Sequence, residues 1–193
     1  MAYETGRAIA SVTVQVRAEP VKKRMEALKK TVIVSAGDLL VHAIGKALRK
    51  FPQFNAREGK PCNQVHIGYI ISVGKGPREM VLEQVDALSV EETAKGIKGL
   101  ALKYLHGEKA EGESTVLVTN LAAFHAYGAI APIKKGHVAT FALASEYDGV
   151  EIREGIAHPD KKFNVTLSFD AEAADCQAAL QCLNEIKKTL ESE

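Results

Sequence analysis

The chain is poor in cysteine, in net charge and in long apolar runs, and each shortage excludes a class of protein. Its 193 residues include three cysteines, an odd number without a Cys-x-x-Cys pair, so neither a disulfide framework nor a zinc site is expected. The formal net charge of +1 gives no field to attract nucleic acid or an anionic membrane. No run approaches the roughly 18 to 20 apolar residues that cross a bilayer, and no signal-peptide pattern opens the chain. We therefore expect a cytoplasmic protein with no metal and with neither nucleic acid nor membrane as a partner.

The composition that remains is that of an ordinary globular domain. Hydrophobic residues make up 46% of the chain and charged residues 25%. A chain of this length can bury a core of its own. Because no repeat, low-complexity tract or long linker interrupts it, we expect residues 1–193 to form a single domain.

Apolar patterning predicts the strands. Residues 8–18 alternate apolar and polar side chains, the period of a half-buried strand. Residues 65–73 are apolar almost throughout, which favours a strand buried on both faces. The sequence indicates further strands at about 80–85, 114–119, 137–145, 149–153 and 163–169.

Capping patterns predict the helices. Ser35 followed by Asp38, and Ser89 followed by Glu92, are N-terminal capping patterns that open apolar stripes of helical period. We also expect a helix from Pro20, where proline suits a first turn, and one over about 173–190. Helices concentrated in the first half and strands in the second predict an α/β two-layer sandwich, a mixed sheet with helices on one face.

The order of these segments from Ala10 to Leu190 resembles one family, the catalytic (E2) acyltransferases of 2-oxo-acid dehydrogenase complexes, which share the chloramphenicol acetyltransferase fold. Residues 35–55 (SAGDLLVHAIGKALRKFPQFN) look like the family's helix that begins S-V-N-D and ends P-x-x-N. Residues 65–73 resemble its V-x-I-G-x-A-V strand, and residues 88–107 its S-L-x-E-I-A helix. Residues 115–123 (TVLVTNLAA) stand where the family has T-F-T-I-S-N-L-G.

The resemblance implies a trimer whose active sites lie in channels between two subunits. Coenzyme A would enter one end of the channel and dihydrolipoamide the other. In the family, a histidine in Asp-His-Arg-x-x-(Asp/Asn)-Gly takes the proton from the attacking thiol. A Ser or Thr hydroxyl in the neighbouring subunit's S-N-L-G loop stabilises the oxyanion. This hydroxyl donates a hydrogen bond to negative charge that develops only in the transition state.

The histidine position of that motif is changed in this chain. Residues 170–176 read DAEAADC, so alanine stands at Ala171, while Asp175 keeps the family's second acidic position. Thr119 occupies the oxyanion-hydroxyl position, although a β-branched residue ending a strand explains it equally well. A general base typically contributes about 10² to 10⁴-fold in rate. We therefore expect the ordinary reaction to be lost.

Other residues are weaker candidates for a role in a channel. His125 follows the Thr119 loop and is the histidine best placed to act as a relocated base, unless it simply faces solvent. Lys134 and Lys135 replace part of the family's Asn-Pro-Pro-Gln turn and would meet coenzyme A phosphates or lie on the surface. Cys176 is a conceivable nucleophile, with a small core residue as the plainer interpretation.

Three functions compete at this point. The first is a degenerate, trimeric acyltransferase-like protein that binds coenzyme A or acyl-CoA or organises an assembly, with no cofactor required. The second is an active acyltransferase with a relocated base, and the third is a purely structural trimer. The sequence carries no lipoyl or subunit-binding segment before its first strand, which is not the pattern of a whole E2 chain.

Overall fold

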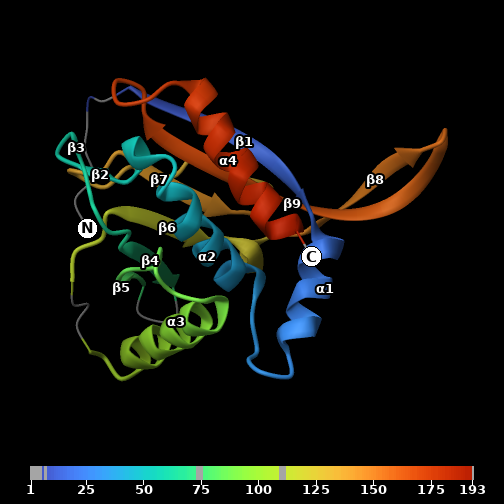
Figure 1. Cartoon of the computed structure of the whole chain (residues 1–193), viewed down its shortest axis with the longest axis horizontal. Coiled ribbons are helices and arrows are strands. Elements are labelled where there is room, and N and C mark those ends of the chain that lie inside the picture. Colours follow the sequence, from blue (N-terminus) through green and yellow to red (C-terminus); the bar gives the residue numbers. More distant parts are fainter. Residues whose placement is uncertain (1–5, 7, 73–75, 109–111, 193) are drawn as a thin grey trace.

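A mixed seven-stranded sheet forms the centre of the molecule (Figure 1). The computed structural model describes residues 6, 8–72, 76–108 and 112–192. The strand order is β1-β9-β7-β6-β4-β5, with β8 paired to β9. The pairs β4–β6 and β6–β7 are parallel and the other pairs are antiparallel. The predicted mixed sheet is therefore confirmed.

The elements have the following bounds. The strands of the sheet are β1 (Ile9–Arg17), β4 (Ile67–Ser72), β5 (Pro77–Leu82), β6 (Val116–Asn120), β7 (Ala139–Leu143), β8 (Tyr147–Arg153) and β9 (Ile156–Asp170). The α-helices are α1 (Ala18–Leu28), α2 (Ala36–Leu48), α3 (Val90–Leu105) and α4 (Cys176–Glu191). A small hairpin, β2 (Ala56–Arg57) with β3 (Lys60–Pro61), and two 3-10 turns, Pro52–Phe54 and Ala122–Phe124, complete the fold.

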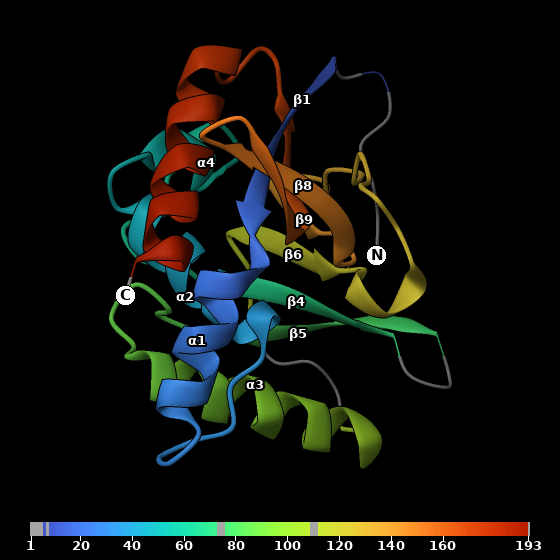
Figure 2. The same ribbon diagram turned by 90° about the vertical axis from the view of Figure 1, so that its right-hand side faces the viewer.

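The hydrophobic core lies between the sheet and its helices, of which α2 and α4 cover one side (Figure 2). Strand β9 shows how the sequence builds this layer, because Val165 and Leu167 alternate with polar residues and both are fully buried in the core. From the helix layer, Leu40 and Ile44 of α2 and Leu183 of α4 are also fully buried. The two-layer arrangement that the amphipathic patterns predict is thus present.

The other face of the sheet, which we call the second face, is polar and still largely buried. Asn164 and Ser168 of β9 point to it and are almost completely covered. The segment between β6 and β7 covers them, since the Ala131 amide donates to Ser168 Oγ at 3.0 Å and Asn164 Nδ2 donates to the Tyr127 carbonyl at 3.0 Å. Figure 2 shows this segment on the side of the sheet opposite α4. Along β9 the second face therefore makes polar contacts, unlike the apolar face under the helices.

Strands β8 and β9 project beyond the sheet as a long hairpin (Figure 1). Its turn is Glu154-Gly155, with φ of 52° and 79°, as a two-residue hairpin of twisted strands requires. The sequence predicted only 163–169 for β9, because the outer part of this hairpin is exposed and lacks a buried stripe.

Most remaining differences concern element boundaries. Helix α1 begins at Ala18 rather than at Pro20, β5 begins three residues before the expected 80, and α4 begins at Cys176 rather than near 173. Both predicted capping boxes are confirmed, at Ser35 and Ser89. Residue 73 of the predicted strand 65–73 lies outside the described residues. Within the described residues, no helix has the length and apolar character to span a membrane.

Candidate functional site

Thr119 lies near the end of β6, on the second face of the sheet. Its neighbour Val118 is buried in the core, so alternation along the strand turns Thr119 away from the helices. The residue is half-buried, and among the described residues no group forms a hydrogen bond with its hydroxyl. A hydroxyl in this state is free to donate to a ligand.

The turn after Thr119 is held by the next residue. Asn120 Nδ2 donates to the Tyr69 hydroxyl at 2.9 Å, and Asn120 Oδ1 accepts from the Ala122 amide at 3.0 Å. Burial is the main cause that raises the pKa of Tyr69, so the phenol stays neutral. A Cβ at Gly37 would lie 2.8 Å from Asn120 Nδ2, so any larger residue there would displace the Asn120 side chain. These contacts fix the backbone that presents Thr119.

Ala171 lies at the opposite end of the sheet. Its exposed methyl group follows the last residue of β9, and its amide donates to the Ala8 carbonyl at 2.9 Å. Thr119 pairs with Ala142, which pairs with Thr166, five residues before Ala171. At about 3.3 Å per residue and about 4.8 Å per strand, Thr119 and Ala171 of one chain lie roughly 19 Å apart. One chain therefore does not bring these two positions into one site.

Asp175 has a structural task. It is the N-cap of α4, and its Oδ1 accepts from the Ala178 amide at 2.7 Å. An aspartate directly before an amphipathic helix is a capping signal that the sequence offered, and our prediction gave it only a family role. Cys176, the first residue of α4, is exposed, so its interpretation as a small core residue is wrong. Cys182 fits that description instead, and burial raises the pKa of its thiol to about 12.

His125 ends the 3-10 turn that follows β6, in the left-handed conformation at φ 55°. Its side chain is exposed, and no described residue forms a hydrogen bond with it. The structure thus places His125 on the same loop as Thr119 but provides no group to orient its imidazole.

Lys134 and Lys135 differ sharply in environment. Lys134 Nζ lies 2.8 and 2.7 Å from the two carboxylate oxygens of Glu79 and 3.4 Å from Ser114 Oγ. Ser114 Oγ also donates to Glu79 and lies 3.0 Å from His137 Nε2. Burial first, then Lys134, lowers the pKa of His137. Lys135 is exposed. Of these two lysines, it is the one whose ammonium group is open to a ligand phosphate.

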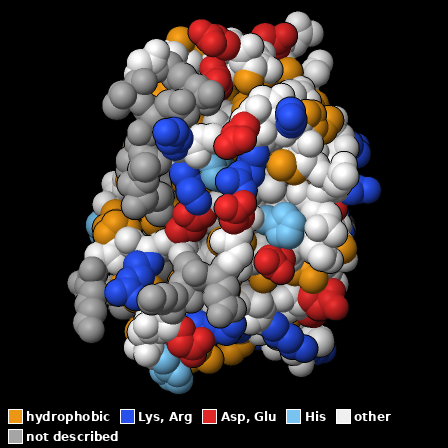
Figure 3. Space-filling view, turned by 90° about the vertical axis from the view of Figure 1, so that its left-hand side faces the viewer, with side chains coloured by type: hydrophobic (Ala, Val, Ile, Leu, Met, Phe, Trp, Pro, Cys, Tyr) orange, Lys and Arg blue, Asp and Glu red, His pale blue; other side chains and the backbone are white. Residues whose placement is uncertain are grey.

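Charged side chains of both signs adjoin one another on the face of the molecule that carries β2 and β3 (Figure 3). Arg57 of β2, for example, pairs with Glu113. Among the described residues, no group of three or more histidine, cysteine, aspartate or glutamate side chains is arranged to hold a metal ion. This face therefore offers an ion-paired surface rather than a metal centre.

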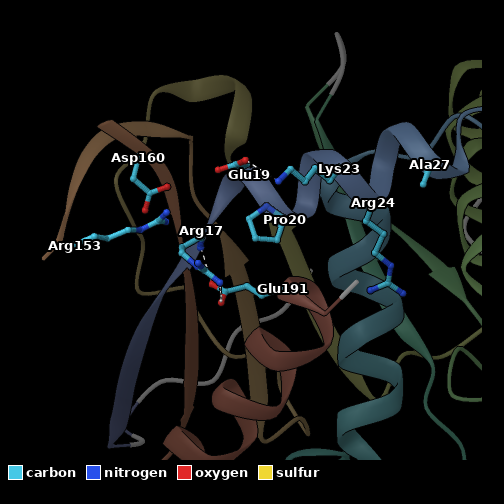
Figure 4. Close-up of a pocket in the computed structure, with 9 residues that line it drawn as sticks. All are labelled: Arg17, Glu19, Pro20, Lys23, Arg24, Ala27, Arg153, Asp160 and Glu191. Carbon is cyan, nitrogen blue, oxygen red and sulfur yellow. Dashed lines mark hydrogen bonds and ion pairs between the residues drawn. The ribbon is translucent and has the colours of Figure 1, made fainter. Parts of the chain in front are cut away.

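A separate hollow of about 480 Å³ opens where α1 meets the β8–β9 hairpin (Figure 4). Arg17 ends β1 here, Arg153 and Asp160 reach in from the hairpin, and Glu191 closes the end of α4. The remaining lining residues come from α1 and are Glu19, Pro20, Lys23, Arg24 and Ala27. Four cationic side chains surround this hollow. This hollow could not be predicted from the sequence, because its lining residues are spread from position 17 to position 191 without a common motif.

The comparisons agree with this architecture. The chain matches the family described as 2-oxoacid dehydrogenases acyltransferase (catalytic domain) over residues 4–193. The dihydrolipoyllysine-residue acetyltransferase component of the pyruvate dehydrogenase complex of Bacillus subtilis (strain 168) is 28% identical over 160 residues, covering 78% of this chain and 36% of the relative. The chain therefore spans little more than a third of that relative's length.

Solved structures share the fold at low sequence identity. A probable dihydrolipoamide acetyltransferase from Listeria monocytogenes superposes with a TM-score of 0.89 at 22% identity, covering 96% of this chain and 85% of that one. The dihydrolipoamide acetyltransferase of Azotobacter vinelandii gives 0.88 at 18%, covering 97% and 83%. Chloramphenicol acetyltransferase gives 0.59 at 11%, covering 96% and 87%, which confirms the predicted fold class. This chain belongs to the family of 2-oxoacid dehydrogenase acyltransferase catalytic domains.

Proposed function

We propose that this protein is a degenerate acyltransferase that binds coenzyme A or an acyl-CoA between copies of itself and no longer transfers the acyl group in the ordinary way. The proposal rests on the exposed methyl group of Ala171, which stands at the histidine position of the family's Asp-His-Arg-x-x-(Asp/Asn)-Gly motif. A methyl group has no lone pair to accept a proton, so the attacking thiol, with an ordinary pKa near 8.5, loses its general base. The nearby carboxylate of Asp175 is occupied as a helix cap.

A homotrimer is the assembly that fits the geometry. Because Thr119 and Ala171 lie at opposite ends of one chain, a channel bordered by both positions requires a partner copy. The β8–β9 hairpin supplies a surface for that partner. Val150 and Ile152 are 58% and 65% exposed, and their cross-strand partners, which share their face, are apolar as well. An apolar strip on a projecting hairpin favours burial against another subunit.

The hollow between α1 and the hairpin suits the charged end of coenzyme A. Among its cations, Lys23 pairs with Glu19 at 2.9 Å and Arg17 with Glu191 at 3.5 Å, and exposed or partly exposed ion pairs of this kind are weak. Asp160, at the hairpin side of the hollow, is six residues along β9 from the level of Thr119, roughly 20 Å at about 3.3 Å per residue. That span suits an elongated ligand with its phosphates at one end and its thiol at the other. Lys135 remains the second candidate phosphate contact.

The alternative is an active acyltransferase that uses Thr119 for the oxyanion and His125 as a relocated base. The position of His125 on the loop that follows Thr119 favours this alternative. A purely structural trimer is the third possibility, and it predicts no ligand in the hollow.

One set of assays separates the three. Acetyl-CoA and dihydrolipoamide are incubated with the protein and with His125→Ala and Thr119→Ala, and coenzyme A binding is measured by calorimetry. We expect binding without transfer. Transfer that either substitution abolishes would establish the active alternative, and absence of binding would leave the structural trimer.

A gain-of-function variant tests the role of Ala171 directly. Ala171→His returns an imidazole to an exposed position, and we expect transfer to appear at about 10²-fold over the unsubstituted protein, the lower end of a general base's contribution. Ala171→Gln is the matched control, since it adds comparable bulk without a base near neutral pH. Equal activity of the two variants would contradict the assignment.

The assembly is tested on the hairpin. Ile152→Glu places a charge on its apolar strip and is expected to shift the sedimentation of the protein from trimer to monomer. Glu151→Gln, on the opposite face of the same strand, is expected to leave the trimer intact. A trimer that withstands Ile152→Glu would exclude the hairpin as the contact.

A further inference from the structure

The hollow between α1 and the hairpin contains a carboxylate that the ion pairs around it do not explain. The Asp160 side chain is 8% exposed, and its Oδ2 is buried without a hydrogen-bond partner. Lys162 Nζ lies 3.8 Å from Asp160 Oδ2, close enough for an ion pair but too far for a hydrogen bond. A buried acceptor left unpaired costs on the order of 1–3 kcal/mol, so such a group calls for an explanation.

The cations around Asp160 are already engaged with other groups. Arg17 lies 3.5 Å from the Glu191 carboxylate and its amide donates to the same side chain at 2.8 Å. Arg153 pairs with Glu151 at 2.6 Å, and Arg24 donates to the Thr189 carbonyl at 2.6 Å. The hollow therefore presents a charged rim next to one unsatisfied buried acceptor.

A bare phosphate does not satisfy this arrangement. It matches the arginine and lysine side chains of the rim, but it is itself an anion, so its O–H groups would reach Asp160 only against the repulsion between phosphate and carboxylate. A nucleotide carries both features, since its phosphates are anionic and its sugar hydroxyls and base amino groups are neutral donors. Hydrogen bonds to an ionised acceptor are the stronger kind.

We propose that Asp160 is a specificity-determining residue that accepts a hydrogen bond from the nucleoside part of the ligand, so that the hollow takes a nucleotide in preference to inorganic phosphate. This inference rests on the proposed binding of coenzyme A and names the group that would select it. Asp160 positions the nucleoside and takes no part in acyl transfer.

Calorimetry with two ligands tests the inference. Coenzyme A and inorganic pyrophosphate are titrated into the unsubstituted protein, Asp160→Asn and the control Asp148→Asn. Asp148 lies on the same hairpin, 89% exposed, and pairs with Lys161 at 3.3 Å outside the hollow. We expect Asp160→Asn to weaken coenzyme A binding roughly tenfold, because the acceptor loses its charge. Pyrophosphate binding should stay equal or strengthen, and Asp148→Asn should change neither ligand.

The outcomes are distinct. Coenzyme A binding that Asp160→Asn leaves unchanged would overturn the inference and leave the proposed function standing. Equal weakening of both ligands would also overturn it, since Asp160 would then only shape the hollow. Failure of the unsubstituted protein to bind coenzyme A would refute the proposed function together with this inference. Retained pyrophosphate binding by Asp160→Asn shows that the variant is folded.

Discussion

The buried histidine of α2 makes the stability of this protein sensitive to mild acid. His42 is 9% exposed, and its Nδ1 is buried without a hydrogen-bond partner. Burial, followed by the cations Lys46 and Arg24, lowers its pKa from 6.5 to about 4. The folded protein thus holds a neutral imidazole that the unfolded chain protonates near pH 6.5. The perturbation we consider is a fall in pH from 7 to 5.

The sign and size follow from proton linkage. Between pH 6.5 and about 4 the unfolded chain binds the proton and the folded protein does not, so stability falls as the pH falls. With these two pKa values, the free energy of unfolding drops by about 2 kcal/mol from pH 7 to pH 5 and by about 3 kcal/mol at pH 4. This loss is a substantial share of the roughly 5–15 kcal/mol typical of a domain.

Urea unfolding at several pH values measures the effect. The unsubstituted protein is compared with His42→Leu, which cannot titrate, and with His158→Gln on the exposed hairpin. The difference in unfolding free energy between His42→Leu and the unsubstituted protein should change by about 2 kcal/mol between pH 7 and 5, while His158→Gln should follow the unsubstituted protein. A difference that stays constant over this range would refute the assignment of a buried neutral imidazole.

Substitutions at Asp175, Lys134 and Gly68, with two comparison variants, test individual contacts by thermal or urea unfolding. Asp175→Ala removes the cap of α4 and should cost about 1 kcal/mol, whereas Asp175→Asn, a good cap, should cost less. Lys134→Met leaves the partly buried Glu79 carboxylate without its cation and should cost about 1–3 kcal/mol, so a neutral result would contradict the ion pair's importance. Gly68→Ala should destabilise by about 1–3 kcal/mol, because its Cβ would lie 2.6 Å from Glu79 Oε1. Gly99→Ala in α3 meets nothing within 4 Å and should stabilise by up to about 1 kcal/mol, so the two glycines should respond with opposite signs.

The local features of the fold could be predicted because they depend on neighbouring residues. Ser35 and Ser89 cap their helices through residues three positions away, and the alternation of 8–18 is visible in nine consecutive residues of β1. The long outer hairpin was predicted only in part. The strand expected at about 149–153 lies within β8, whereas the outer part of β9 was missed because residues 156–159 are all exposed and show no buried stripe.

The candidate site likewise has parts that depend on local sequence and parts that depend on contacts between distant residues. The assignment of Ala171 to the histidine position rests on the resemblance of one sequence motif and stays a prediction. The contact of Lys134 with Glu79 joins residues 55 positions apart and is set by the arrangement of β5 and the turn before β7. The hollow around Asp160 likewise depends on five elements, β1, α1, β8, β9 and α4, that meet only in the folded chain. Contacts of this kind follow from topology, which the sequence determines only through the whole fold.

The helix cap at the start of α4 affects how members of this family can be classified as active or inactive from their sequences. Because Asp175 holds the first turn of a helix, its carboxylate is useful whether or not any thioester is ever cleaved nearby. A motif that is only partly preserved is then compatible with a site that has no catalytic activity. Counting its preserved residues therefore overestimates how much activity remains. The informative position is the one that only the reaction needs, and under the proposed alignment this chain has Ala171 there.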